Sequence, residues 1–409
     1  MPGEPWGVIL LGLALAAAAA AAAAWILRGA GIAGGRPAAA VVGGVLAGVL
    51  LGPAVLGRVA PAAHERLYLG AIAERRALDS LTARQAADLI ALQATAPTPE
   101  AIADLRSRHA AEQAPLVDAL NAARAQHRSR LGTAAAALLA VGIGLAAWCG
   151  RRPAGLASAP IAAAIALGAE LGVMVLIGRF FGLPWGLTVG LAATGACGSA
   201  FAGVPMRWVP RAGRSAPALT TGVWAFVLAC AAIVLAADPG RWPAALLPAG
   251  AMLIGLIAGG AARRGQSARR AVRAALANAI IPAAVAVAAL HVEWWRFADD
   301  GRAWPLVLTV TLVAGNAAIV GLWLALRRIP DPPTYTDLVG WHATGFSATQ
   351  ACVATLLPAT GLCDPSTSAG SAVLAGILLS AAVGETTIAL LGATLAGHPE
   401  THRSEPPAN

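Results

Sequence analysis

The chain has 409 residues, of which 58% are hydrophobic and only 12% are charged, and its mean hydropathy is +0.69. An ordinary soluble domain carries about 25% charged residues, so this composition excludes a large soluble core. The net charge is +9 and all 29 basic residues are arginine, but most stand in short segments between apolar runs. Such placement is typical of topology signals rather than of a nucleic-acid-binding surface.

Seven stretches contain no Asp, Glu, Arg or Lys: 7–27, 37–57, 131–150, 180–206, 215–237, 242–262 and 303–326. About 20 apolar residues at 1.5 Å per residue match a hydrocarbon core of roughly 30 Å. A backbone in lipid must satisfy its own hydrogen bonds, and these runs are too uniform for barrel strands. The sequence predicts an all-α polytopic membrane protein with about 11 transmembrane helices, at 7–27, 37–57, 131–149, 156–178, 184–205, 216–236, 243–262, 274–292, 303–326, 337–358 and 369–396.

The arginines predict the orientation of these helices. One set of loops and the tail carries 15 arginines, the short loops on the other side carry 4, and a long insertion holds the remaining 10. The positive-inside rule assigns the arginine-rich side to the cytoplasm and does not count a long insertion. We therefore expect an inner-membrane protein with its N-terminus outside and its C-terminus cytoplasmic. The segment MPGEPW lacks a basic residue, so we expect 7–27 to be a retained helix rather than a signal peptide.

The insertion at 58–130 is the one long polar segment, with 10 Arg and 8 acidic residues. Helical spacing of its apolar residues predicts a helix over about 62–95, which the Ala-Pro-Thr-Pro sequence at 96–99 ends. Thr98 as N-cap, Pro99 at the first position and Glu100 in the first turn predict a second helix. The expected organisation is two helices in 1–57, an extracytoplasmic helical hairpin at 58–130, the other membrane helices in 131–397 and a cytoplasmic tail at 398–409.

The sequence contains no pattern that indicates a metal site, a cofactor site or an enzyme. The five cysteines form no CxxC pair and most lie in apolar runs, which argues against a zinc site and a disulfide framework. No nucleophile–base pattern indicates an enzyme. Gly44, Gly48 and Gly52 share one helix face that permits close packing, within the chain or in a homodimer.

Residues 35–57, GRPAAAVVGGVLAGVLLGPAVLG, resemble the second helix of the monovalent cation:proton antiporters (sodium/hydrogen exchangers, Kef-like branch). A close variant of AGxxLGPxxLG is typical there, and seven residues match it: Ala47, Gly48, Leu51, Gly52, Pro53, Leu56 and Gly57. The segments 182–200, 254–264, 280–294 and 337–395 resemble later family segments in the same order. The resemblance implies an antiporter-like fold of two inverted repeats around a midplane crossover, and cation:proton exchange as the function.

The sequence departs from this family at the ion site. The family usually carries its ion and proton on a carboxylate pair in the helix after the segment that 182–200 resembles. Residues 182–237 contain no Asp or Glu, and Trp224 and Ala225 stand about where the pair would fall. We therefore expect an altered or lost ion site.

Glu170 and Glu385 are the carboxylates that lie near the centres of predicted membrane helices. An intramembrane carboxylate is costly and indicates function by default, although a structural hydrogen bond is the alternative. His342 could relay protons near pH 6–7 or could be a polar interface residue. Further polar residues are candidates for the pore or crossover: Thr194, Ser199, Asn316, Thr344, Ser347 and Gln350.

Three functions remain open from the sequence. The first is a transporter of the cation:proton antiporter class, with a monovalent cation and the proton as substrates and the lipid bilayer as its surroundings. The second is a transport-inactive paralogue that acts as a membrane scaffold or sensor and binds a protein partner at its outer hairpin. The third is a carrier of a neutral or anionic solute that uses the dipoles of broken helices.

Overall fold

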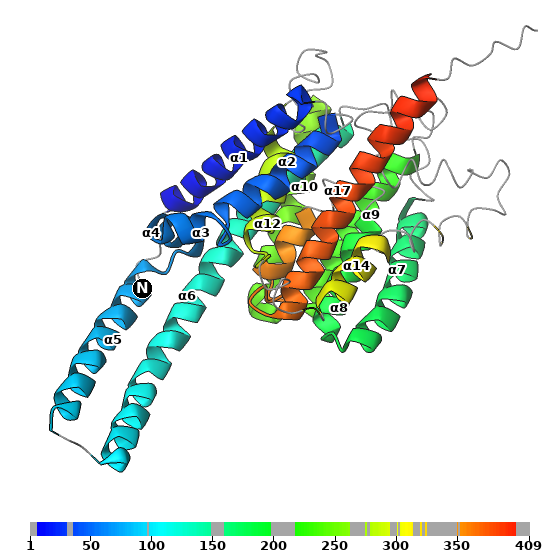
Figure 1. The fold of residues 1–409 in the computed structure, drawn as a ribbon. Coiled ribbons are helices and arrows are strands. Elements are labelled where there is room, and N and C mark those ends of the chain that lie inside the picture. The colour runs from blue at the N-terminus through cyan, green and yellow to red at the C-terminus, as the bar shows by residue number, and fades with distance from the viewer. Residues whose placement is uncertain are drawn as a thin grey trace, which may run out of the picture.

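The computed structural model describes residues 6–30, 36–95, 98–148, 159–197, 217–261, 279–294, 303–313 and 352–397, with single positions between them. The named elements of this part are all helices (Figure 1). In chain order they are α1 (Trp6–Gly29), α2 (Arg36–Leu51), α3 (Leu56–Val59), α4 (Pro61–His64), η1 (Glu65–Leu69), α5 (Ile72–Gln93), α6 (Pro99–Trp148), α7 (Ala159–Phe181), α8 (Trp185–Ala196), α9 (Pro217–Ala236), η4 (Pro239–Arg241), α10 (Trp242–Ala261), α12 (Ile281–Leu290), α14 (Ala303–Val313) and α17 (Ser368–Gly397).

Four segments of the described chain are helical, long and apolar enough to cross a membrane: Trp6–Gly29, Ala39–Val59, Ala163–Phe181 and Pro239–Gly259. Shorter apolar helices lie at Phe226–Ala236, Ile281–Leu290, Ala303–Val313 and Ser368–Val383. The fold is therefore compatible with a helical membrane protein, as the composition predicts. The number of eleven spans and the inverted repeat stay predictions.

Two helices predicted as continuous are interrupted in the structure. The helix expected over 37–57 is interrupted after Leu51 and resumes as α3 at Leu56, because Pro53 has no N–H to donate and its ring obstructs the preceding turn. The single helix expected over 62–95 is broken after Leu69, where Gly70 adopts a left-handed conformation with φ of 69°. Glycine takes this conformation at little cost, so the chain turns there before α5 begins.

The hairpin of α5 and α6 projects from one end of the helical bundle (Figure 1). The predicted cap is confirmed, since Thr98 Oγ1 accepts a hydrogen bond of 3.3 Å from the backbone N–H of Ala101. From Pro99 the helix α6 continues without interruption for 50 residues to Trp148, a length of about 75 Å. One helix therefore joins the projecting hairpin directly to the apolar bundle.

Small residues allow the helices of the bundle to pack closely. A Cβ on Gly44 would lie 2.7 Å from the carbonyl oxygen of Pro282, and one on Gly48 would lie 2.7 Å from that of Ala286. The predicted glycine face of α2 thus packs against α12 within the same chain. Gly144 of α6 and Gly255 of α10 permit a similar close crossing between those two helices.

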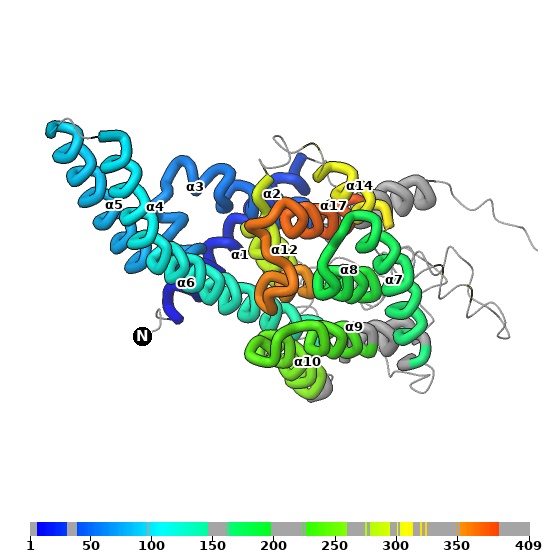
Figure 2. Tube along the Cα trace, turned by 90° about the horizontal axis from the view of Figure 1, so that it is seen from below, coloured from blue at the N-terminus to red at the C-terminus, as the bar shows by residue number. Residues whose placement is uncertain are grey.

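The hairpin and the first described residue lie at one end of the bundle, whereas α17 ends at the other (Figure 1). Tyr68 of η1 packs in a buried cluster with Ile9 and Leu13 of α1, so the start of α1 lies beside the base of the hairpin. Figure 2 shows α7 and α8 together on the side of the bundle away from the hairpin tip.

Candidate functional site

Three predicted site residues can be placed with their side chains: Glu170 in α7, Thr194 in α8 and Gln350, a helical residue close to the helical residues 352–359. All three are fully buried. Glu385 belongs to α17, but its side chain lies outside the described part of the structure. The other candidates also lie outside the described residues: His342, Ser199, Asn316, Thr344 and Ser347.

Glu170 is the middle residue of α7, and its carboxyl group lies against the last turn of α8. A Cβ added to Gly195 would stand 2.6 Å from both Cδ and Oε2 of Glu170. Any larger residue at 195 would therefore displace the carboxyl group. Thr194, the neighbour of Gly195, donates its hydroxyl hydrogen to the carbonyl oxygen of Leu191 at 2.6 Å.

The helix α8 is short for a membrane-crossing element. Its 12 residues span about 18 Å, roughly half of a hydrocarbon core. Cys197 forms its C-cap, and the backbone N–H of Cys197 bonds to the carbonyl oxygen of Gly195. The carboxyl group of Glu170 therefore lies against the C-terminal turn of a short buried helix.

Two neighbouring helices cover opposite faces of α8. Gly186 and Gly190, one turn apart, contact Leu362 and Leu357, whereas the face with Gly195 meets α7.

Gln350 is fully buried, and neither its amide nitrogen nor its oxygen has a hydrogen-bond partner within the described part of the chain. A buried amide without partners costs several kcal/mol in an apolar surrounding, of order 2–7. Glu170 and Gln350 are thus both fully buried polar residues of the described chain.

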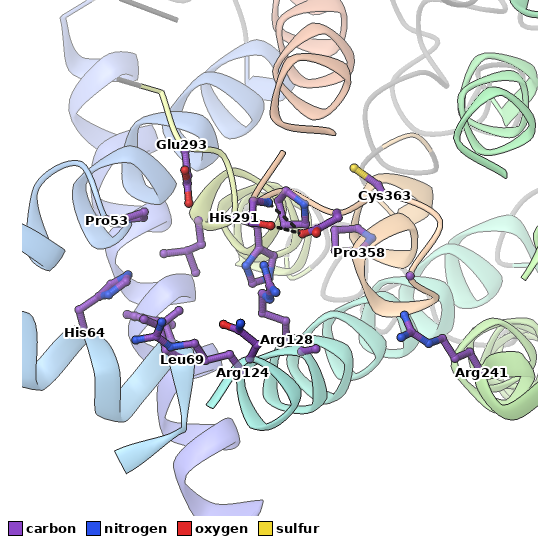
Figure 3. A pocket seen from close by; sticks show the side chains of 18 residues that line it. Pro53, His64, Leu69, Arg124, Arg128, Arg241, His291, Glu293, Pro358 and Cys363 are labelled. Atoms are coloured by element: carbon purple, nitrogen blue, oxygen red, sulfur yellow. Dashed lines mark hydrogen bonds between the residues drawn. The ribbon is translucent and has the colours of Figure 1, made fainter. Parts of the chain in front are cut away.

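A second polar site lies at the base of the hairpin, where a cavity of about 550 Å³ is lined by η1, α6, the end of α12 and the loop before α17 (Figure 3). Arg124 of α6 holds Glu65 of η1 by two short bonds, 2.8 and 3.0 Å from its Nη2 to the two carboxylate oxygens. Arg128, one turn further along α6, also lines the cavity. Burial lowers the pKa of Arg128, while Asp364 and Glu293 act in the opposite direction.

This second site was not predicted from the sequence. Its lining residues come from six separate segments, and their charges look like an ordinary solvated surface when each segment is considered alone. The usable signal was the sequence His291-Val292-Glu293, which follows a charge-free helix directly. Polar residues at the end of an apolar helix mark the place where the chain leaves the bundle.

No protein-family model, no curated protein and no solved structure matches this chain. Within the described residues, no group of three or more His, Cys, Asp or Glu side chains is placed to hold a metal ion.

Proposed function

We propose that this protein is an integral membrane transporter of the cation:proton antiporter class, in which Glu170 binds either a proton or a monovalent cation. The observation that supports this proposal is the fully buried carboxyl group of Glu170 against the C-terminal turn of α8. The resemblance of 35–57 to the antiporter family gives the reaction class.

The physical argument concerns charge. The C-terminal end of a helix carries a partial negative charge of about half an elementary charge. A carboxylate beside it is repelled, and the repulsion is strong in an apolar surrounding. A proton or a cation on Glu170 relieves this repulsion, and free carbonyl groups of the helix end can complete the coordination of a cation. Proton and cation then compete for one place, as exchange requires.

The test is a transport assay with the full chain in proteoliposomes that enclose a pH-sensitive dye. Addition of Na⁺ or K⁺ should release protons from the lumen in the wild type. Glu170→Gln should abolish this signal, whereas Glu100→Gln, at an exposed position at the start of α6, should leave it unchanged. Full exchange by a Glu170→Gln/Glu385→Gln double variant would show that neither carboxylate is required. His342 would then be the next candidate for the proton carrier.

The proposal includes the orientation given by the arginines, with the hairpin outside the cell and the loop after α1 in the cytoplasm. Ile90 of α5 and Ala30 after α1 are both exposed, so cysteines at these positions should be accessible from their own side. An impermeant thiol reagent added to intact cells should label Ile90→Cys and spare Ala30→Cys. The reverse labelling pattern would invert the topology.

A membrane scaffold or sensor is the second candidate, and the projecting hairpin favours it (Figure 1). Its two helices are held together by polar contacts around Gln85, whose amide nitrogen donates to the carbonyl oxygen of His109 at 3.1 Å. Such a stalk lies far from Glu170 and has no evident use in exchange. If the wild type gave no proton-release signal with Na⁺, K⁺ or Li⁺ in the same assay, the result would favour this function.

A further inference from the structure

The cavity at the base of the hairpin contains two buried polar groups that lack a partner. Tyr68 is 2% exposed and His291 is 7% exposed. Neither the hydroxyl of Tyr68 nor Nε2 of His291 has a hydrogen-bond partner among the described residues, although both side chains line the cavity. Buried polar groups in proteins are nearly always satisfied, so two such groups around one cavity indicate a ligand that completes them.

Charges of both signs surround these two groups. Arg124, Arg128 and Arg241 bring positive charge, and Glu293 and Asp364 bring negative charge. Arg124 is paired with Glu65, and Arg128 interacts electrostatically with Asp364 and Glu293. In Figure 3, Glu293 lies across the cavity from Arg124. The positive and negative charges that face the cavity thus balance, which disfavours a simple anion or cation and suits a ligand that carries both charges.

We propose that this cavity binds a zwitterion, a molecule with an anionic group and an ammonium group. Arg128 binds the anionic group, with the hydroxyl of Tyr68 and Nε2 of His291 as its hydrogen-bond partners, and Glu293 and Asp364 accept the ammonium group. The volume of about 550 Å³ is within the range of small-molecule sites. Two sources share this chemistry: a free solute such as a peptide, and the headgroup of phosphatidylethanolamine.

The state of the side chains fits this assignment across the physiological pH range. Burial lowers the pKa of His291 to about 3, with Arg128 contributing in the same direction, so the ring is neutral. Burial raises the pKa of Tyr68 to about 12, so its hydroxyl keeps its proton and can donate it. The site therefore offers uncharged hydrogen-bonding groups between arginine and carboxylate side chains.

The experiment measures binding to the full-length protein in nanodiscs. The free probe is L-alanyl-L-alanine, compared with N-acetyl-alanyl-alanine, which lacks the ammonium group, and alanyl-alanine methyl ester, which lacks the carboxylate. Both derivatives should bind at least tenfold more weakly than the parent dipeptide. Arg128→Gln should weaken dipeptide binding at least tenfold, whereas Arg108→Gln, an exposed arginine of the hairpin, should not.

Tyr68→Phe separates binding from folding, since it keeps the buried ring and removes only the hydroxyl. It should weaken binding several-fold with an unchanged thermal midpoint. In a second arm, native mass spectrometry records lipids retained by the detergent-purified protein. Retention of phosphatidylethanolamine over phosphatidylglycerol, lost in Arg128→Gln and without dipeptide binding, would identify the lipid as the source. Equal binding of the acetylated probe, equal loss in Arg108→Gln, or no binding in either arm would overturn the proposal.

Discussion

The two polar sites differ in the number and sign of their ionisable side chains. At the end of α8, one carboxyl group, that of Glu170, is fully buried against the last turn of the helix. At the base of the hairpin, arginines and carboxylates line one cavity of about 550 Å³. The first site has one tightly packed carboxyl group, which suits a small ion. The second balances its charges over a larger space, which suits a polar molecule.

This difference predicts that the two sites respond to different substitutions. The site of Glu170 should be sensitive to changes of a single atom or charge and contribute little to folding. The base of the hairpin should be sensitive to loss of packing, because Tyr68 and the contacts of α6 belong to the buried interior. Four changes test this comparison.

The largest effect is expected from Gly195→Ala. The added methyl group would lie 2.6 Å from Cδ of Glu170 and must displace the carboxyl group. We expect exchange to fall at least tenfold in the proteoliposome assay, because the carboxyl group can no longer lie at the helix end. Gly168→Ala is the matched control, since a Cβ at this position in α7 meets nothing within 4 Å. Equal exchange by the two variants would contradict the assigned geometry.

Tyr68→Ala should have the largest effect on stability. Its ring fills a buried cluster with residues of α1 and α6, and loss of a large buried side chain costs about 3–5 kcal/mol. The thermal midpoint in detergent should fall by several degrees or more. Ile90→Ala, at a residue of α5 that is 68% exposed, should leave it almost unchanged. Equal midpoints would show that the base of the hairpin is not part of the folded interior.

A smaller effect is expected from pH. The pKa of His291 falls from its ordinary value near 6.5 to about 3 in the folded protein, mainly because burial disfavours the charged ring. Between about pH 6.5 and 3, the ring is therefore protonated in the unfolded state but neutral in the folded state. The free energy of unfolding should decrease as pH falls through this range. The thermal midpoint should decrease less steeply over this range in His291→Gln. Parallel curves for the two proteins would exclude this contribution.

The smallest effect is expected from shortening the hairpin. Its distal part carries exposed ion pairs such as Arg75–Asp79, which contribute at most about 1 kcal/mol each. Replacing residues 75–117 with a short Gly/Ser loop should leave the thermal midpoint and exchange nearly unchanged. Replacing 62–128 should be harmful, because it also removes Tyr68 and the Arg124–Glu65 pair. Loss of folding in the shorter replacement would place the distal hairpin in the core.

Much of the helical organisation followed from the sequence, because apolar runs and caps are local signals. The start of α6 at Pro99 is an example, with Thr98 as its predicted cap. The break at Gly70 was missed because a single glycine within a helical pattern also occurs inside helices. The position of Glu170 in the middle of a helix also followed from the sequence.

The contacts of the two sites could not be predicted. Gly195 is one of many glycines in the sequence, and only the packing of α7 on α8 makes it the residue against Glu170. Likewise, Tyr68, Arg128 and His291 lie far apart in the chain. Their meeting depends on the turn at Gly70 and on the unbroken course of α6.

The central claim is that a cation displaces a proton from Glu170. Infrared difference spectroscopy tests it directly, because a protonated carboxyl group has a carbonyl band that the carboxylate lacks. Addition of Na⁺ or K⁺ to the protein in liposomes at constant pH should remove such a band in the wild type and not in Glu170→Gln. A wild-type spectrum without a cation-dependent carbonyl change, or the same change in Glu170→Gln, would contradict the account.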